Sequence, residues 1–172
     1  MKGVFWKEGE PFNNSMSLIV SLMVRYPEIA TLSLDPQEKT LHFTFLIGHE
    51  LAEAEFRLFL QDYTMSLEVL AELNQRNYSI ASISYYTQDN FSFLEVVRDI
   101  SSLSQEEISL IVHLVREKLG ELVCDPEDVV GEEEQVFQEE LIEHMLEDLK
   151  DSRQEKKLIG IREEGRVMIF NR

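Results

Sequence analysis

The stretch that most constrains the fold is the long helix-like run over residues 49–76. Similar phrases flank this run, IATLS at 29–33 and IASIS at 80–84, and each opens a stretch of alternating apolar and polar residues. Alternation with a period of two is typical of a half-buried β-strand. We therefore expect a helix followed by a β-hairpin to occur twice, at an offset of 51 residues. A chance similarity between two hairpins is the alternative.

Three hairpins are predicted from paired alternating runs joined by turn residues. The first joins 30–34 to 40–47, the second joins 79–86 to 91–98, and the third joins 158–161 to 166–170. The intervening segments are rich in Asp, Asn, Pro and Gly, which favour turns.

The remaining periodic runs predict helices. Residues 16–26 are apolar on almost every side and end before Pro27, which disfavours helical geometry in the preceding residue. Ser104 and Glu107 have the spacing of a capping box, which predicts a helix start. Residues 132–150 form a strongly acidic amphipathic pattern. In the run 49–76 the polar side chains occupy an arc of only about 100°, so neighbouring helices, strands or a second subunit should cover most of that helix.

These elements predict an α+β fold: an antiparallel sheet built from helix–hairpin (αββ) units, with helices on one face. An acidic C-terminal helix and a short β-hairpin complete it. The expected divisions are an irregular arm at 1–12, a body at 13–123, a linker at 124–131 and a C-terminal module at 132–172. This module is too small to form a core alone, so it should dock on the body or on a second subunit.

The net charge of −17 is concentrated in one segment. Between Glu121 and Asp151 there are 13 acidic residues and one lysine, which leaves −5 for the other 141 residues. Such a field repels nucleic acid and anionic membrane surfaces, so neither is an expected partner. A basic protein surface is the partner that this charge favours.

Cys124 is the only cysteine, which fits a reducing compartment. The apolar run 16–24 lacks the flanking features of a signal peptide and is shorter than the roughly 20 residues that cross a bilayer. The expected location is therefore cytoplasmic.

Sequence motifs indicate no complete catalytic site. The run His49-Glu50-Leu51-Ala52-Glu53 begins like the zinc-protease motif H-E-x-x-H but has Glu53 in place of the second histidine. The favoured interpretation is structural, since Glu50 and Glu53 suit the positive end of a helix dipole.

Two carboxylates on the apolar side of the run 49–76 are candidate ligand-binding residues. Glu55 and Asp62 lie two helical turns apart on one face, and carboxylates in such positions are paired or functional. The structural alternative is an ion pair with an arginine such as Arg25, Arg98 or Arg116.

A second candidate cluster lies on the acidic helix. Glu140, His144 and Glu147 share one face and could hold a divalent metal. The alternative, a solvated acidic face, is the commoner reading of such a pattern. The sequence indicates no cofactor.

The lack of a complete catalytic motif favours a non-enzymatic protein that acts through protein–protein interaction. A homodimer is expected, in which the apolar side of the acidic helix (Phe137, Leu141, Met145 and Leu149) contributes buried surface. The alternative is a regulator that binds a small ligand or a divalent metal, or a weakly marked hydrolase, using the carboxylates of 49–76 or 132–150.

Overall fold

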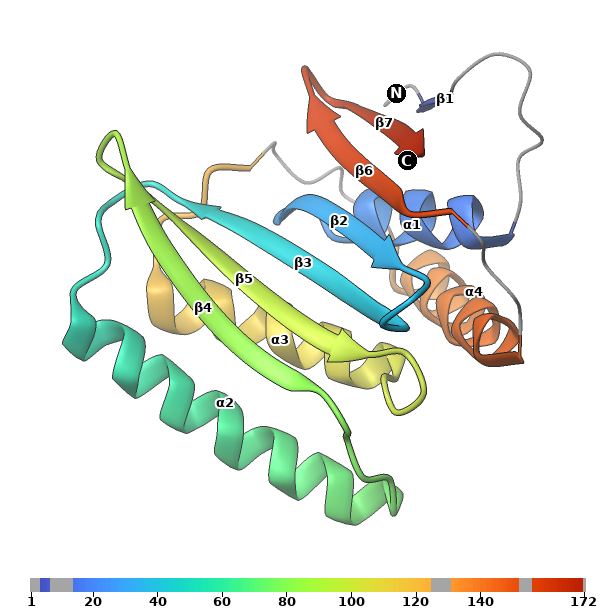
Figure 1. Ribbon diagram of the computed structural model, residues 1–172, viewed down its shortest axis with the longest axis horizontal. Coiled ribbons are helices and arrows are strands. Elements are labelled where there is room, and N and C mark those ends of the chain that lie inside the picture. The colour runs from blue at the N-terminus through green and yellow to red at the C-terminus, as the bar shows by residue number, and fades with distance from the viewer. Residues whose placement is uncertain (1–3, 7–13, 125–130, 152–155, 172) are drawn as a thin grey trace.

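The computed structural model describes residues 4–6, 14–124, 131–151 and 156–171 (Figure 1). The helices in this part are α1 (Asn14–Arg25), α2 (Glu53–Asn74), α3 (Gln105–Leu119) and α4 (Glu132–Asp151). The strands are β1 (Val4–Trp6), β2 (Ile29–Asp35), β3 (Thr40–Ile47), β4 (Ala81–Gln88), β5 (Phe91–Asp99), β6 (Leu158–Glu163) and β7 (Arg166–Asn171).

The described strands form one sheet in the order β1-β7-β6-β2-β3-β5-β4. The hairpins β2–β3 and β4–β5 meet through antiparallel pairing of β3 with β5. The third hairpin, β6–β7, extends the sheet through antiparallel pairing of β6 with β2. The predicted α+β class with helix–hairpin units is therefore confirmed.

The first strand departs from the sequence expectation. Val4–Trp6 pairs in parallel with β7, so this part of the segment 1–12 is a strand and not an irregular arm. Three residues are too few to show an alternating pattern, so the sequence did not predict their pairing with a distant strand. The rest of that segment, and residues 125–130 of the expected linker, lie outside the described residues.

Two of the hairpin turns are tighter than their sequences suggested. Strands β4 and β5 are joined by Asp89-Asn90 alone, with φ angles of 53° and 69°. Strands β6 and β7 are joined by Glu164-Gly165, with φ angles of 49° and 75°. Positive φ at both central residues matches the right-handed twist of the flanking strands, and Asn and Gly tolerate that conformation.

Helix α2 begins at Glu53, four residues later than the sequence pattern suggested. The Oγ of Ser92 on β5 accepts the Leu51 N–H (2.8 Å) and donates to the His49 carbonyl (2.8 Å). These bonds hold residues 49–51 against the sheet. The Ala52 N–H then donates to the Glu55 carboxylate at 3.3 Å, which satisfies one amide at the start of the helix.

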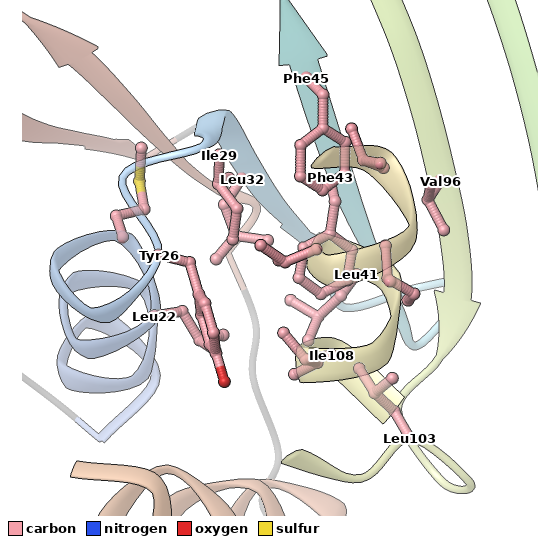
Figure 2. Close-up of a cluster of buried hydrophobic side chains, with 14 of the residues drawn as sticks. Leu22, Tyr26, Ile29, Leu32, Leu41, Phe43, Phe45, Val96, Leu103 and Ile108 are labelled. Carbon is pink, nitrogen blue, oxygen red and sulfur yellow. The ribbon is translucent and has the colours of Figure 1, made fainter. Parts of the chain in front are cut away.

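All four described helices lie on one face of the sheet (Figure 1). Figure 2 shows the core between α1, α3 and the strands, where Leu22, Leu32, Phe43 and Ile108 converge. These four side chains have exposed fractions of 0–1%. Over the described residues, no helix combines the length and apolar character needed to cross a membrane.

The C-terminal elements pack on their own chain. Helix α4 buries Ile142, Leu146 and Leu149, and it lies against α1 and α3. Helix α1 can approach β6 closely because Gly160 has no side chain: a Cβ there would lie 2.5 Å from Cγ2 of Ile19. In this structure α4 and the β6–β7 hairpin therefore pack on the body.

Candidate functional site

The most prominent surface feature is a row of exposed apolar side chains along α2. Leu58, Met65, Val69 and Leu73 are 64%, 58%, 57% and 75% exposed. Their spacing of seven, four and four residues places them on one face of the helix. A buried face, formed by Phe59, Tyr63, Leu67 and Leu70, holds α2 against the rest of the fold. The expectation that neighbours would cover most of α2 therefore holds for only part of its apolar surface. We call the exposed row the α2 stripe.

Three residues of the α2 stripe, Met65, Val69 and Leu73, lie on one wall of a groove. Helix α3 forms the other wall, which includes the half-buried Leu110 and the exposed His113. An ion pair between Asp62 on α2 and Lys118 on α3 (3.5 Å) links the two helices. The residues that line this apolar groove are Met65, Ser66, Val69, Leu70, Leu73, Gln105, Glu106, Ser109, Leu110, His113 and Glu139.

The apolar groove continues into an acidic cleft between α3 and α4. The two depressions share Gln105, Glu106 and Glu139, and the cleft adds Glu140 and Glu143. Arg25 binds Glu139 at 2.9 Å, and Glu143 accepts the Gln105 N–H at 2.7 Å. Glu106 and Glu140 remain exposed. The combined surface is apolar along one half, and its other half carries four glutamates and one arginine, Arg76, which pairs with Glu147 at 3.5 Å. We call this surface the α2–α4 groove.

A buried charge cluster lies behind the groove, and no sequence pattern predicted it. The guanidinium of Arg98 donates to both carboxylate oxygens of Glu107 (2.6 and 2.7 Å), to the Ile80 carbonyl (2.9 Å) and to Ser102 Oγ (3.1 Å). It also pairs with Asp99. Arg98, Asp99 and Glu107 are 1–3% exposed.

Asp99 accepts hydrogen bonds from the segments that precede β4 and follow β5. Its carboxylate accepts the N–H groups of Ser79, Ile80 and Ser102 and both hydroxyls of Ser101 and Ser102. Burial alone would raise the pKa of Asp99, but these hydrogen bonds and the charge of Arg98 outweigh it and hold the pKa well below its usual range. The cluster ties the start of β4, the end of β5 and the start of α3 together, which is a structural role.

Tyr63 lies near this cluster. Burial raises the pKa of the Tyr63 phenol, and the neighbouring carboxylate of Glu107 raises it further. Its hydroxyl is buried and has no hydrogen-bond partner among the described residues. The hydroxyls of Ser101 and Ser102 both donate to the Asp99 carboxylate, whose lowered pKa makes it a weak general base.

The two candidate ligand-binding carboxylates do not form one site. Glu55 binds the Ala52 N–H and lies 3.4 Å from Nε2 of His49, at the start of α2. Asp62 pairs with Lys118 on α3. The arginines suggested as partners lie elsewhere: Arg25 pairs with Glu139, Arg98 with Asp99 and Glu107, and Arg116 with Glu28.

The three candidate metal ligands do not share a partner. Glu140 is exposed, His144 lies 3.7 Å from Asp148, and Glu147 pairs with Lys150 at 2.7 Å and with Arg76 at 3.5 Å. The hydrogen bond from Lys150 lowers the pKa of Glu147. Within the described residues, no group of three His, Cys, Asp or Glu side chains could hold a metal ion.

The four residues of the expected interaction surface divide into two pairs. Leu149 is buried and Met145 packs on the core, so both serve the contact of α4 with its own chain. Phe137 and Leu141 are 64% and 42% exposed. Only these two remain accessible to another molecule.

The open face of the sheet carries polar side chains that satisfy one another. His42 Nδ1 lies 3.0 Å from the Glu95 carboxylate, and His42 Nε2 lies 3.0 Å from Thr40 Oγ1. Tyr86 stacks on Phe93 at 4.9 Å between ring centroids. His42 therefore links the Thr40 hydroxyl to the Glu95 carboxylate, and Thr40 itself is only 2% exposed.

No protein-family model, curated protein or solved structure matches this chain. The function is therefore argued from the residues of the α2–α4 groove.

Proposed function

We propose that this protein is a non-enzymatic binding protein whose α2–α4 groove holds an amphipathic helix of another protein, with basic residues at one end of that helix. The observation that carries the proposal is the α2 stripe. Exposed apolar patches of this kind mark interaction sites, since leaving such side chains in water is unfavourable.

The shape and composition of the groove support a helical occupant. Two roughly adjacent helices, α2 and α3, provide the walls, and apolar side chains line the half formed by Met65, Val69 and Leu73. An amphipathic helix binds such a groove by inserting apolar anchors at i, i+3, i+4 and i+7.

The charges support a basic end on that helix. Glu143 already accepts a hydrogen bond from the backbone at the start of α3, and Glu139 already forms an ion pair with Arg25. Glu106 and Glu140 are exposed in the acidic half and can pair with Lys or Arg side chains of a partner. Opposite charges across an interface raise the association rate and fix the orientation of the bound segment.

The binding test uses two synthetic peptides with leucines at i, i+3, i+4 and i+7. One peptide carries lysines at one end, and the other carries glutamates there. Fluorescence anisotropy should show binding of the basic peptide only. The double variant Val69→Gln/Leu73→Gln should bind at least about tenfold more weakly, because one lost apolar contact costs about 1.5–3 kcal/mol and about 1.4 kcal/mol is tenfold.

The matched control is Phe170→Gln, which removes an apolar side chain that is 45% exposed on β7. This variant should bind as the unaltered chain does. Both variants should unfold within about 0.5 kcal/mol of the unaltered chain, because the replaced side chains are exposed. Equal binding of both peptides, no binding, or equal losses in the two variants would contradict the proposal.

A separate variant tests the contribution of the acidic residues to binding. Glu106→Gln/Glu140→Gln should weaken binding of the basic peptide at low salt and should have little effect at high salt, where screening already removes the attraction. A reducing cytoplasmic location is part of the proposal and is supported by the presence of a single cysteine, Cys124.

A further inference from the structure

The outer edge of strand β4 is the second surface that requires an explanation. This strand ends the sheet and runs for eight residues, ASISYYTQ, with no charged residue and no proline. Its pairing with β5 is continuous from Ala81↔Arg98 to Gln88↔Phe91, without a bulge. Natural proteins protect sheet edges with charges, prolines, bulges or a covering segment, because an edge can pair with another chain.

At the opposite edge of the sheet, the short strand β1 pairs with β7 along Val4–Trp6. Over the described residues, no strand pairs with the outer side of β4. We propose that this edge pairs with a second copy of the chain: two β4 strands run antiparallel across a twofold axis and join the two sheets into one.

The distribution of charge favours a second copy at this edge. Two chains of net charge −17 repel each other, so their contact must keep the acidic segments apart. Helix α4 packs on α1, and α1 packs on β2, β6 and β7, at the other side of the sheet from β4 (Figure 1). A contact between β4 edges therefore separates the two acidic helices by the width of both sheets.

Helix α2 provides complementary charges next to this edge. Asp62 faces α3, so Arg57, Thr64 and Glu68 lie on the flank of α2 that is turned away from α3. Arg57 and Glu68 are exposed and three helical turns apart, and Arg57 also pairs with Glu53 of its own helix at 2.6 Å. A twofold axis that passes between them brings Arg57 of each chain towards Glu68 of the other.

Side-chain direction restricts the register of the pairing. Ala81, Ile83 and Tyr85 point to the helix face, whereas Ser82, Ser84 and Tyr86 are exposed on the open face. Residues directly opposite in an antiparallel pair share a face, so each pair must join residues of the same set. The pairing centred on Ser84 places Ser84 opposite its own copy, Ser82 opposite Tyr86, and Ile83 opposite Tyr85.

This dimer is independent of the peptide groove. The α2 stripe lines the groove beside α3, whereas β4 contacts another side of α2 through Tyr85 and Phe56. Both α2–α4 grooves of the dimer remain open. The interface also differs from the one expected on 132–170, whose strands and helix pack on their own chain in this structure.

Analytical ultracentrifugation of the full chain tests the pairing. The unaltered protein should sediment as a dimer. Ser84→Asp should be monomeric, because it places two carboxylates directly opposite each other, and like charges in that position are destabilising. The control Gln37→Asp adds the same charge in the exposed β2–β3 turn and should remain dimeric. A monomeric unaltered protein, or a dimeric Ser84→Asp variant, would overturn the proposal.

Disulfide cross-linking in a Cys124→Ser background tests the register. Ser84→Cys should cross-link, because directly opposite residues have Cα atoms about 4.5–5.5 Å apart, within the range of a disulfide. Ser82→Cys should not, because four residues of offset separate the two copies by about 13 Å at about 3.3 Å per residue. Cross-linking through position 82 instead of 84, or through neither, would overturn this pairing. Circular dichroism melts should show that both variants retain the fold.

Discussion

The guanidinium of Arg98 at the end of β5 holds the carboxylate of Glu107 in the first turn of α3 by two hydrogen bonds of 2.6 and 2.7 Å. Both side chains are almost completely buried. Sequence spacing suggested that Glu107 would cap α3 together with Ser104. Ser104 Oγ does accept the Glu107 N–H at 3.2 Å, but the Glu107 side chain is directed to Arg98 instead. The second half of the predicted capping box is therefore replaced by a tertiary ion pair.

Breaking this pair should be costly. Glu107→Gln and Arg98→Met should each destabilise the protein by about 3–5 kcal/mol, because each leaves an uncompensated buried charge or polar group. The double variant Arg98→Met/Glu107→Leu should lose less than the sum of the single losses. Urea unfolding measures all three free energies.

The exposed pair of Arg57 and Glu53 is the control for this measurement. Its atoms lie 2.6 Å apart, yet both side chains are more than 70% exposed. Glu53→Gln should change the unfolding free energy by less than about 1 kcal/mol, because solvent screens such pairs. Equal losses in Glu53→Gln and Glu107→Gln would contradict the structural role assigned to the buried cluster.

Asp99 predicts a dependence of stability on pH. Its pKa in the folded state is lowered, so its stabilising contribution is present above the unfolded value of about 3.9 and disappears as the pH falls through the folded value. Asp99→Asn should be less stable than the unaltered protein at pH 7, by about 1.5–3 kcal/mol from weakened hydrogen bonds to a charged group. The difference should narrow below about pH 4.

Unfolding by urea at a series of pH values between 3 and 7 measures this difference. Asp151→Asn provides the control, because Asp151 is exposed at the end of α4. The stability curve of that variant should run parallel to that of the unaltered protein. A constant difference between Asp99→Asn and the unaltered protein across this range would show that the Asp99 charge does not contribute as described.

The close approach of α1 to β6 predicts a coupled pair of substitutions. Gly160→Ala should destabilise the protein by about 1–3 kcal/mol, because the new Cβ would lie 2.5 Å from Cγ2 of Ile19 and 2.8 Å from the sulfur of Met23. Ile19→Leu removes that Cγ2 methyl. The double variant should therefore recover part of the loss, and a double-mutant cycle measures the coupling. Strict additivity would show that α1 does not pack against Gly160 as described.

Local sequence patterns predicted the helices, the three hairpins and the α+β class, because periodicity and turn residues depend on neighbours in the chain. The Ser104 cap was predicted for the same reason. The start of α2 was predicted four residues early, because Ser92, which holds residues 49–51, lies about forty residues further on.

Only the tertiary structure decided the contacts between residues that are far apart in the sequence. The pairing of β6 with β2 and of β1 with β7 depends on which edges meet in space. The partner of Asp62 is Lys118 and not an arginine, and Arg98 serves a buried cluster. The sequence alone showed that α2 has a wide apolar surface. Its packing against α3 and the sheet decided which part is buried and left Leu58, Met65, Val69 and Leu73 exposed, because a helix can bury only the faces that neighbouring elements reach.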